Sequence, residues 1–134
     1  MAILVTNSGE VQFLQNGVDS AFTSCGLYAA PVARDRLLTL SGLTIADFSG
    51  YDGVHDITWM AAFINALGKG QRLAPSTQWV SADPCSVANM IYGAYYLDSF
   101  GNLSAIYPFD TPINVNSPFI PIVFQPSLTC QSPP

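Results

Sequence analysis

Charged residues are scarce in this sequence. They make up 10% of the 134 residues, against roughly 25% in an average soluble domain. The formal net charge is −5, and the only basic residues are Arg34, Arg36, Lys69 and Arg72. With no basic stripe to neutralise phosphates, we expect no binding to nucleic acid or to anionic lipid. So few charges do not cover a domain's surface. Ser, Thr, Asn and Gln supply part of the remaining polarity, and we expect partner subunits to cover the rest.

Long apolar runs and targeting segments are also missing. Gly, Pro, Asp and Asn interrupt every apolar run before it reaches the length of a membrane span. Residues 1–7 carry no basic residue and only a three-residue aliphatic run, unlike a secretory signal. We therefore expect synthesis in the cytoplasm and no membrane association.

Cysteines are few and odd in number. Cys25, Cys85 and Cys130 are widely spaced, which fits neither a zinc motif nor a disulfide framework. We interpret Cys25 and Cys85 as small buried apolar residues. Cys130, close to a Pro-rich end, has the alternative of pairing with another chain in an oxidising medium.

Ten prolines and ten glycines are spread along the chain as turn punctuation between short apolar segments. One short helix is expected near the N-terminus, with Ser8 as N-cap and Gly17 just past its end. Val11, Leu14 and Val18 recur there at helical spacing. Extended segments are predicted at residues 3–5, 26–30, 91–97, 103–107, 113–115 and 120–124, with a strand or an extended arm at 37–45.

The segment 57–67 satisfies two periodicities. Ile57, Met60 and Ile64 fit one face of a helix, whereas Ile57, Trp59 and Phe63 alternate as one face of a strand. Residues 68–70 suit a hairpin turn after such a strand. The clearest local prediction is a β-hairpin over residues 91–107, with its turn at residues 98–102 and with Tyr92 and Tyr96 on one face. One of its two faces is expected to meet solvent or a partner.

About eight short antiparallel strands and one helix predict an all-β chain, specifically a β-sandwich. The length suits one domain over residues 1–134. Pro118, Pro121 and Pro126 restrict the last segments to edges or bulges. Residues 126–134 are expected to form an extended tail.

No catalytic, cofactor-binding or metal-binding residue is predicted. Asp52, His55 and Asp56 match no defined metal spacing, and a lone His among acids in a turn is more often a solvated loop residue. No Gly-x-Ser-x-Gly motif or phosphate loop is present. The aromatic residues suit either a sugar-stacking platform or the sandwich core and interfaces, and the second interpretation is favoured. The residues weighed in this way are Trp59, Trp79, Tyr92, Tyr95, Tyr96, Phe100, Tyr107 and Phe109.

Several motifs occur in a familiar order. They are residues 4–11 (LVTNSGEV), 48–51 (FSGY) and 91–98 (IYGAYYLD), followed by 102–103, 108–109 and the apolar ending 120–124 (IPIVF). This set resembles a family of small tailed-bacteriophage virion proteins, some of which act as capsid cement or decoration proteins. The resemblance implies a β-sandwich on the outer capsid surface, a homotrimer, and an extended segment at residues 57–64. The sequence departs from the family pattern at residues 30–44 and 68–76.

The predicted function is therefore that of a phage capsid cement or decoration protein. The expected partners are the major capsid protein and further copies of the chain. A tail or receptor-binding domain that recognises host glycans is the alternative. An enzyme using His55 is a third hypothesis, for which His55→Ala is the test. Copy number separates the first two, because decoration proteins rival the capsid protein in number and tail proteins are few.

Overall fold

A computed structural model describes residues 3–9, 11 and 17–129 of the chain. Nearly all of its regular structure is β, and every strand pairing is antiparallel, so the predicted all-β fold is confirmed. The elements in chain order are β1 (Leu4–Val5), α2 (Val18–Ala21), β2 (Ser24–Tyr28), η1 (Leu40–Gly42), β3 (His55–Asp56), β4 (Phe63–Ile64), β5 (Gly70–Leu73), β6 (Thr77–Val80), β7 (Asn89–Leu97), β8 (Leu103–Val115), β9 (Pro121–Phe124) and β10 (Ser127–Thr129).

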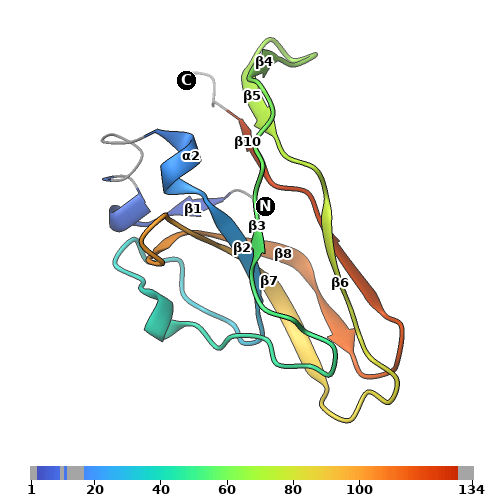
Figure 1. Cartoon of the computed structure of the whole chain (residues 1–134). Helices are drawn as coiled ribbons and strands as arrows, with labels where there is room; N and C mark the ends of the chain where they lie inside the picture. Colours follow the sequence, from blue (N-terminus) through green and yellow to red (C-terminus); the bar gives the residue numbers. More distant parts are fainter. Residues whose placement is uncertain (1–2, 10, 12–16, 130–134) are drawn as a thin grey trace.

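The first layer is a five-stranded sheet in the order β1-β8-β7-β2-β3 (Figure 1). Its centre is the hairpin β7–β8, which confirms the hairpin predicted over residues 91–107 and extends it to residues 89–115. The Asp98 carboxylate closes the turn, because its Oδ1 accepts hydrogen bonds from the backbone N–H groups of Phe100 (2.8 Å) and Asn102 (3.0 Å). Gly101 supplies the positive φ that the turn requires.

The second layer is a long two-stranded ribbon. β6 pairs with β9, and β5 pairs with β10 further along the same two chain segments. A hydrogen bond from the Ala74 N–H to the Pro126 carbonyl (3.0 Å) links the two paired stretches. The segment expected as a tail from residue 126 is thus extended but paired over Ser127–Thr129, while residues 130–134, with Cys130, lie outside the described residues.

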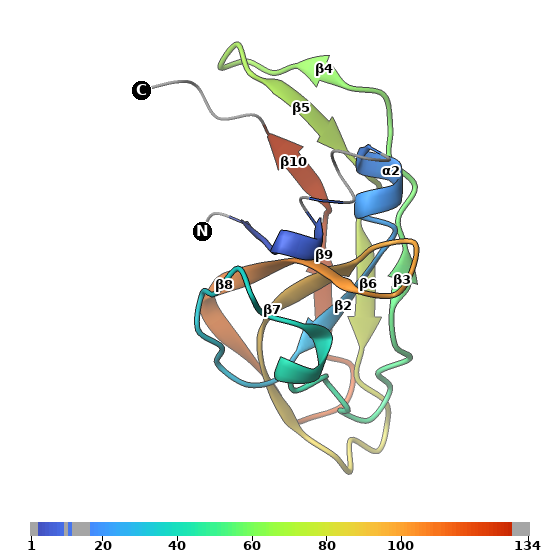
Figure 2. The ribbon, with the colours of Figure 1, turned by 90° about the vertical axis from the view of Figure 1, so that its left-hand side faces the viewer.

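The main core lies between these layers. Trp79, Ile122 and Phe124 of the ribbon pack against Cys25, Leu27, Tyr96 and other buried residues of the five-stranded sheet. The alternation within β9, with Ile122 and Phe124 buried and Pro121 and Val123 exposed, shows which face of the ribbon is turned inward. Figure 2 shows the ribbon running past the sheet, with β4 and β5 at its far end.

The opposite face of the five-stranded sheet is also covered. Tyr28, Tyr95 and Ile106 pack there with Leu43 from the irregular segment that follows β2. Two glycines make room for the tyrosine rings across the β2–β7 pair, since Gly26 lies opposite Tyr95 and Gly93 opposite Tyr28. Over residues 91–97 both faces are thus covered, and the prediction that one face of the hairpin meets solvent or a partner is wrong for this strand, whereas Tyr107 and Phe109 of β8 stay half-buried.

The expected facing of Tyr92 is also wrong. Tyr92 packs in the cluster of Tyr95, whereas Tyr96 belongs to the main core. A register shift between Ile91 and Gly93 is the cause, because one bulged residue reverses the in–out alternation on one side of it.

Two further local predictions need correction, and one alternative left open by the sequence is decided. Residues 37–45 form no strand: they contain η1 and a single bridge from Ile45 to Tyr28. Of the two alternatives for residues 57–67, the structure has no helix there but a short strand at Phe63–Ile64, followed by a turn at residues 66–67. Near the N-terminus, residues 7–9 and 11 are helical, but Val18 belongs to the separate helix α2, and Glu10 and Leu14 lie outside the described residues.

Candidate functional site

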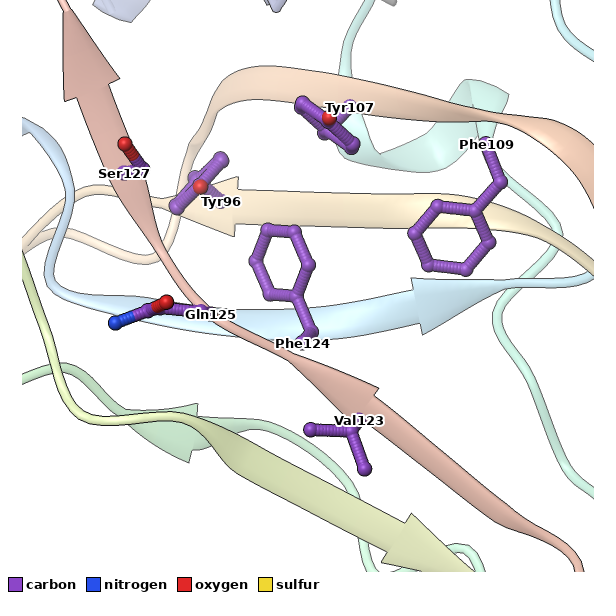
Figure 3. A pocket seen from close by; sticks show the side chains of 7 residues that line it. All are labelled: Tyr96, Tyr107, Phe109, Val123, Phe124, Gln125 and Ser127. Atoms are coloured by element: carbon purple, nitrogen blue, oxygen red, sulfur yellow. The ribbon is translucent and has the colours of Figure 1, made fainter.

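An aromatic pocket opens where the ribbon leaves β8 of the five-stranded sheet uncovered. Its volume is about 270 Å³. Phe124 of β9 lies at the centre of the ring cluster, with centroid distances of 5.8 Å to Tyr96, 5.6 Å to Tyr107 and 6.5 Å to Phe109. Figure 3 shows these four rings gathered between the two layers. The lining residues are Tyr96, Tyr107, Phe109, Val123, Phe124, Gln125 and Ser127.

The pocket follows from the unequal width of the two layers. Two ribbon strands cannot cover five sheet strands, so Tyr107 and Phe109 of β8 stay half-buried beside the open edge of β9. Val123 faces outward at this edge and is 59% exposed. The pocket is therefore an incompletely closed part of the apolar core.

The side chains of Gln125 and Ser127 in the pocket form hydrogen bonds within the ribbon. The Gln125 amide donates to the Ala74 carbonyl (3.2 Å), and the Gln71 amide donates to the Ser127 hydroxyl (3.1 Å). Burial raises the pKa of Tyr96 well above its ordinary value, and the nearby Cys25 raises it further. A hydrogen bond from the Ser127 backbone partly opposes this rise. Among the described residues, no charged side chain lines the pocket. This chemistry suits an apolar group better than an ion.

A second candidate surface is the segment that we call the arm, residues 57–73, which includes β4 and β5. Ile64 is 70% and Leu67 is 80% exposed, and Met60 and Phe63 are also exposed. The tip is held in one conformation by Asn65, whose Oδ1 accepts hydrogen bonds from the N–H groups of Leu67 (2.9 Å) and Lys69 (3.1 Å). Gly68, at φ 76°, completes a turn over residues 65–69, so the hairpin turn predicted at residues 68–70 forms but lies earlier in the chain, because Gly70 of β5 already pairs with Ile64.

His55 is not the solvated loop residue that the sequence suggested. Its ring stacks on Trp79 with a centroid distance of 4.5 Å and an angle of 12°. Nδ1 is hydrogen-bonded to the Thr77 hydroxyl, and Nε2 lies 2.8 Å from Oδ1 of Asp52. The Trp79 indole N–H in turn donates to the Gly53 carbonyl (2.8 Å), so the cluster ties β3 and its preceding turn to β6.

Asp56, the third residue of the metal hypothesis, does not join this cluster, because neighbouring residues of a strand point to opposite faces. Within residues 3–9, 11 and 17–129, no group of three or more His, Cys, Asp or Glu side chains is placed to hold a metal ion. The hydroxyl–imidazole–carboxylate order of Thr77, His55 and Asp52 matches that of a hydrolase triad. Here the His55 ring stacks flat on Trp79 and Thr77 is part of the β6–β9 pairing, so these three residues hold β3 against β6.

The interpretation of the aromatic residues as core is confirmed for Trp79, Tyr95 and Tyr96, which are buried. Trp59 is half-buried, and its indole N–H donates to the Phe22 carbonyl (2.8 Å). Phe100 is exposed in the β7–β8 turn. Cys25 is buried as expected, whereas Cys85 is only partly so.

Two features of the site were missed from the sequence. The sequence signal for the arm is the absence of any charged residue between Asp56 and Lys69. This signal is typical of an apolar hairpin that contacts another molecule. The pocket depends on Phe124 meeting residues of β7 and β8, and no local pattern marks that contact.

In comparisons with known proteins, no protein-family model, no curated protein and no solved structure matches this chain. The resemblance to phage virion proteins therefore stays a prediction. In the described part of the chain, no helix is long and apolar enough to cross a membrane.

Proposed function

We propose that this chain is a structural protein of a bacteriophage particle, a cement or decoration protein that binds the outer capsid surface and stabilises the head. The observation that carries the proposal is the exposure of large apolar side chains in a chain with only 10% charged residues. Monomeric proteins rarely leave such apolar surfaces uncovered. The motifs at residues 4–11, 48–51 and 91–98 support the virion context.

Exposed apolar residues are found at two opposite ends of the molecule, in addition to other positions such as Leu37 and Phe100. The arm is at one end, and the β8–β9 turn and the β6–β7 connection are at the other (Figure 1). Phe119 in the β8–β9 turn is 70% exposed at φ 61°, a conformation that costs a non-glycine residue energy. A strained, exposed Phe is typical of a residue kept for contact, so we assign this end to the major capsid protein.

Each bound copy adds contact area across the boundaries between capsomers, and this area must be broken before the shell bursts under genome pressure. An interface of about 1,600 Å² binds tightly when a few aromatic residues anchor it. Self-association as a homotrimer, with no cofactor and no catalytic step, completes the proposal.

Sedimentation of the recombinant protein with expanded capsids that lack it tests the proposal. We expect the protein to pellet with the capsids in numbers that rival the capsid protein. Phe119→Ser should weaken this binding at least tenfold. Phe100→Ser, at an equally exposed Phe (72%) in the β7–β8 turn, is the matched control and should bind normally. No pelleting of the wild-type protein would contradict the proposal.

A tail protein that recognises host glycans is the second candidate, favoured by the half-exposed rings of Tyr107 and Phe109 in the pocket. Sugars stack on such rings. Binding of the protein to host-surface polysaccharide, lost in Tyr107→Ala, together with a few copies per particle, would favour this function over decoration.

A further inference from the structure

The arm is an apolar surface that the described part of the chain leaves uncovered. Residues 57–68 contain no charged residue, and Ile64 and Leu67 are among the most exposed apolar side chains of the described residues. The Asn65 hydrogen bonds hold the tip in a defined shape, so little conformational entropy is lost when it binds. In the described part of the chain, β4 pairs only with β5, which leaves its outer edge open for a further strand.

The aromatic pocket is the complementary surface. It lies on the body next to the base of the arm, where Ser127 pairs with Leu73, and its lining is apolar apart from Gln125, Ser127 and the tyrosine hydroxyls. At about 270 Å³ it falls below the roughly 300–1,000 Å³ of pockets that hold drug-sized ligands. Aliphatic side chains from another polypeptide suit it better. Within the described residues β9 pairs only with β6, so the edge beside the pocket is open as well.

The arm and the rest of the chain have formal charges of opposite sign. Residues 57–82 contain Lys69 and Arg72 and no acidic residue. The remaining residues contain nine acidic and two basic residues, a formal charge of −7. Arg72 is 3.2 Å from Asp19 of its own chain, so Lys69 is the cation that the tip presents. Two acidic bodies repel, but a basic arm against an acidic body attracts.

We propose that the arm of one copy inserts into the aromatic pocket of a second copy, with Ile64 and Leu67 against Val123, Phe109 and Phe124. The contact is heterologous, since each copy gives an arm and receives one. Such a contact closes into a ring when its rotation allows. This inference rests on the self-association within the proposed function and names its two surfaces.

A mixing experiment tests the exchange directly. The arm variant is Ile64→Asp with Leu67→Asp, and the pocket variant is Val123→Asp. All three side chains are exposed, so both variants should melt within a few degrees of the wild-type protein. Leu37→Asp, at a residue that is 73% exposed outside both surfaces, is the control. Light scattering after gel filtration gives the mass of each protein and of the mixture.

We expect the wild-type protein and Leu37→Asp to be oligomeric and each of the other variants to be monomeric. The mixture should give a one-to-one dimer, because the intact arm of the pocket variant meets the intact pocket of the arm variant. Two monomers in the mixture would overturn the inference, as would oligomers of either variant alone.

Failure of the inference is separable from failure of the proposed function. A wild-type protein that is monomeric yet pellets with expanded capsids overturns the arm exchange and leaves decoration standing. If the arm variant alone then fails to pellet, the capsid protein is the arm's partner. An oligomer that ignores capsids supports the exchange and contradicts decoration.

Discussion

The five-stranded sheet and the arm differ in the solvent exposure of their apolar side chains. Around β7, at the centre of the sheet, both faces are covered, and Leu27, Ile91, Ile106 and Tyr96 are fully buried. In the arm, Ile64 and Leu67 face solvent although the backbone around them is well hydrogen-bonded. Apolar residues in the sheet hold the chain together, whereas those of the arm contribute little to its folding. The difference teaches that the arm's sequence is suited to contact with another molecule.

Trp79→Ala should have the largest effect. Trp79 is fully buried between the layers and supports the His55 ring, so its removal should lower the free energy of unfolding by about 3–5 kcal/mol. Leu67→Ala in the arm should change it by less than about 0.5 kcal/mol. Urea unfolding followed by circular dichroism measures both. Equal losses would erase the distinction between the two regions.

Gly93→Ala should have the next largest effect. A Cβ at Gly93 would lie 2.5 Å from the Tyr107 carbonyl oxygen and 2.5 Å from the Tyr28 hydroxyl, so the hairpin or the ring must shift. We expect a loss of about 1–3 kcal/mol. Gly42→Ala is the control, because its Cβ would approach only the end of the Leu38 side chain. A harmless Gly93→Ala would mean that the covered face of the sheet is loosely packed.

Alkaline pH should destabilise the sheet. Burial raises the pKa of the Cys25 thiol from 9.0 to about 12, and that of Tyr28 from 10.0 to about 12 against an opposing effect of Arg34. Folding favours the protonated thiol and phenol, so both groups add to the free energy of unfolding at neutral pH. This stabilisation decreases once the groups ionise in the unfolded chain, and it is lost as the pH rises from about 9 towards 12. Cys25→Ala should remove about 1 kcal/mol of the loss between pH 9 and 10, a range in which the tyrosines of the unfolded chain, with an ordinary pKa of about 10, are at most half ionised.

Urea midpoints from pH 8 to pH 11 check this expectation. Cys85→Ala, at the partly exposed thiol, is the control and should keep the wild-type pH profile. An unchanged profile in Cys25→Ala would show that the buried thiol is not the group that titrates first.

Phe119→Gly should have the smallest effect and the opposite sign. Glycine adopts φ 61° without steric cost, so the free energy of unfolding should rise by up to about 1 kcal/mol. The gain should be accompanied by weaker capsid binding. A loss of stability would show that Phe119 packs against the body and would remove it from the exposed set.

The sequence predicted what depends on neighbouring residues and missed what depends on distant ones. The hairpin at residues 91–107 was predictable because tyrosines and Ile91 favour strands and Asp98, Gly101 and Asn102 favour the turn. The facing of Tyr92 was missed, since the bulge beside it has only a single glycine, Gly93, as its sequence mark. His55 was misread because its stacking partner, Trp79, lies 24 positions away.

Residues 57–67 were ambiguous for a related reason. Their apolar residues fit both the helical and the strand period, and the pairing of Phe63 and Ile64 with Gln71 and Gly70 decides between them. The exposure of this segment follows from its position at the end of the ribbon, which its own composition does not determine.

Sedimentation velocity of the wild-type protein over a wide concentration range tests most directly whether neighbouring copies cover the arm. Assembly predicts a particle of about three times the 14.3 kDa of one chain, dissociating only on strong dilution. A species with the mass of a single chain at every concentration would contradict it.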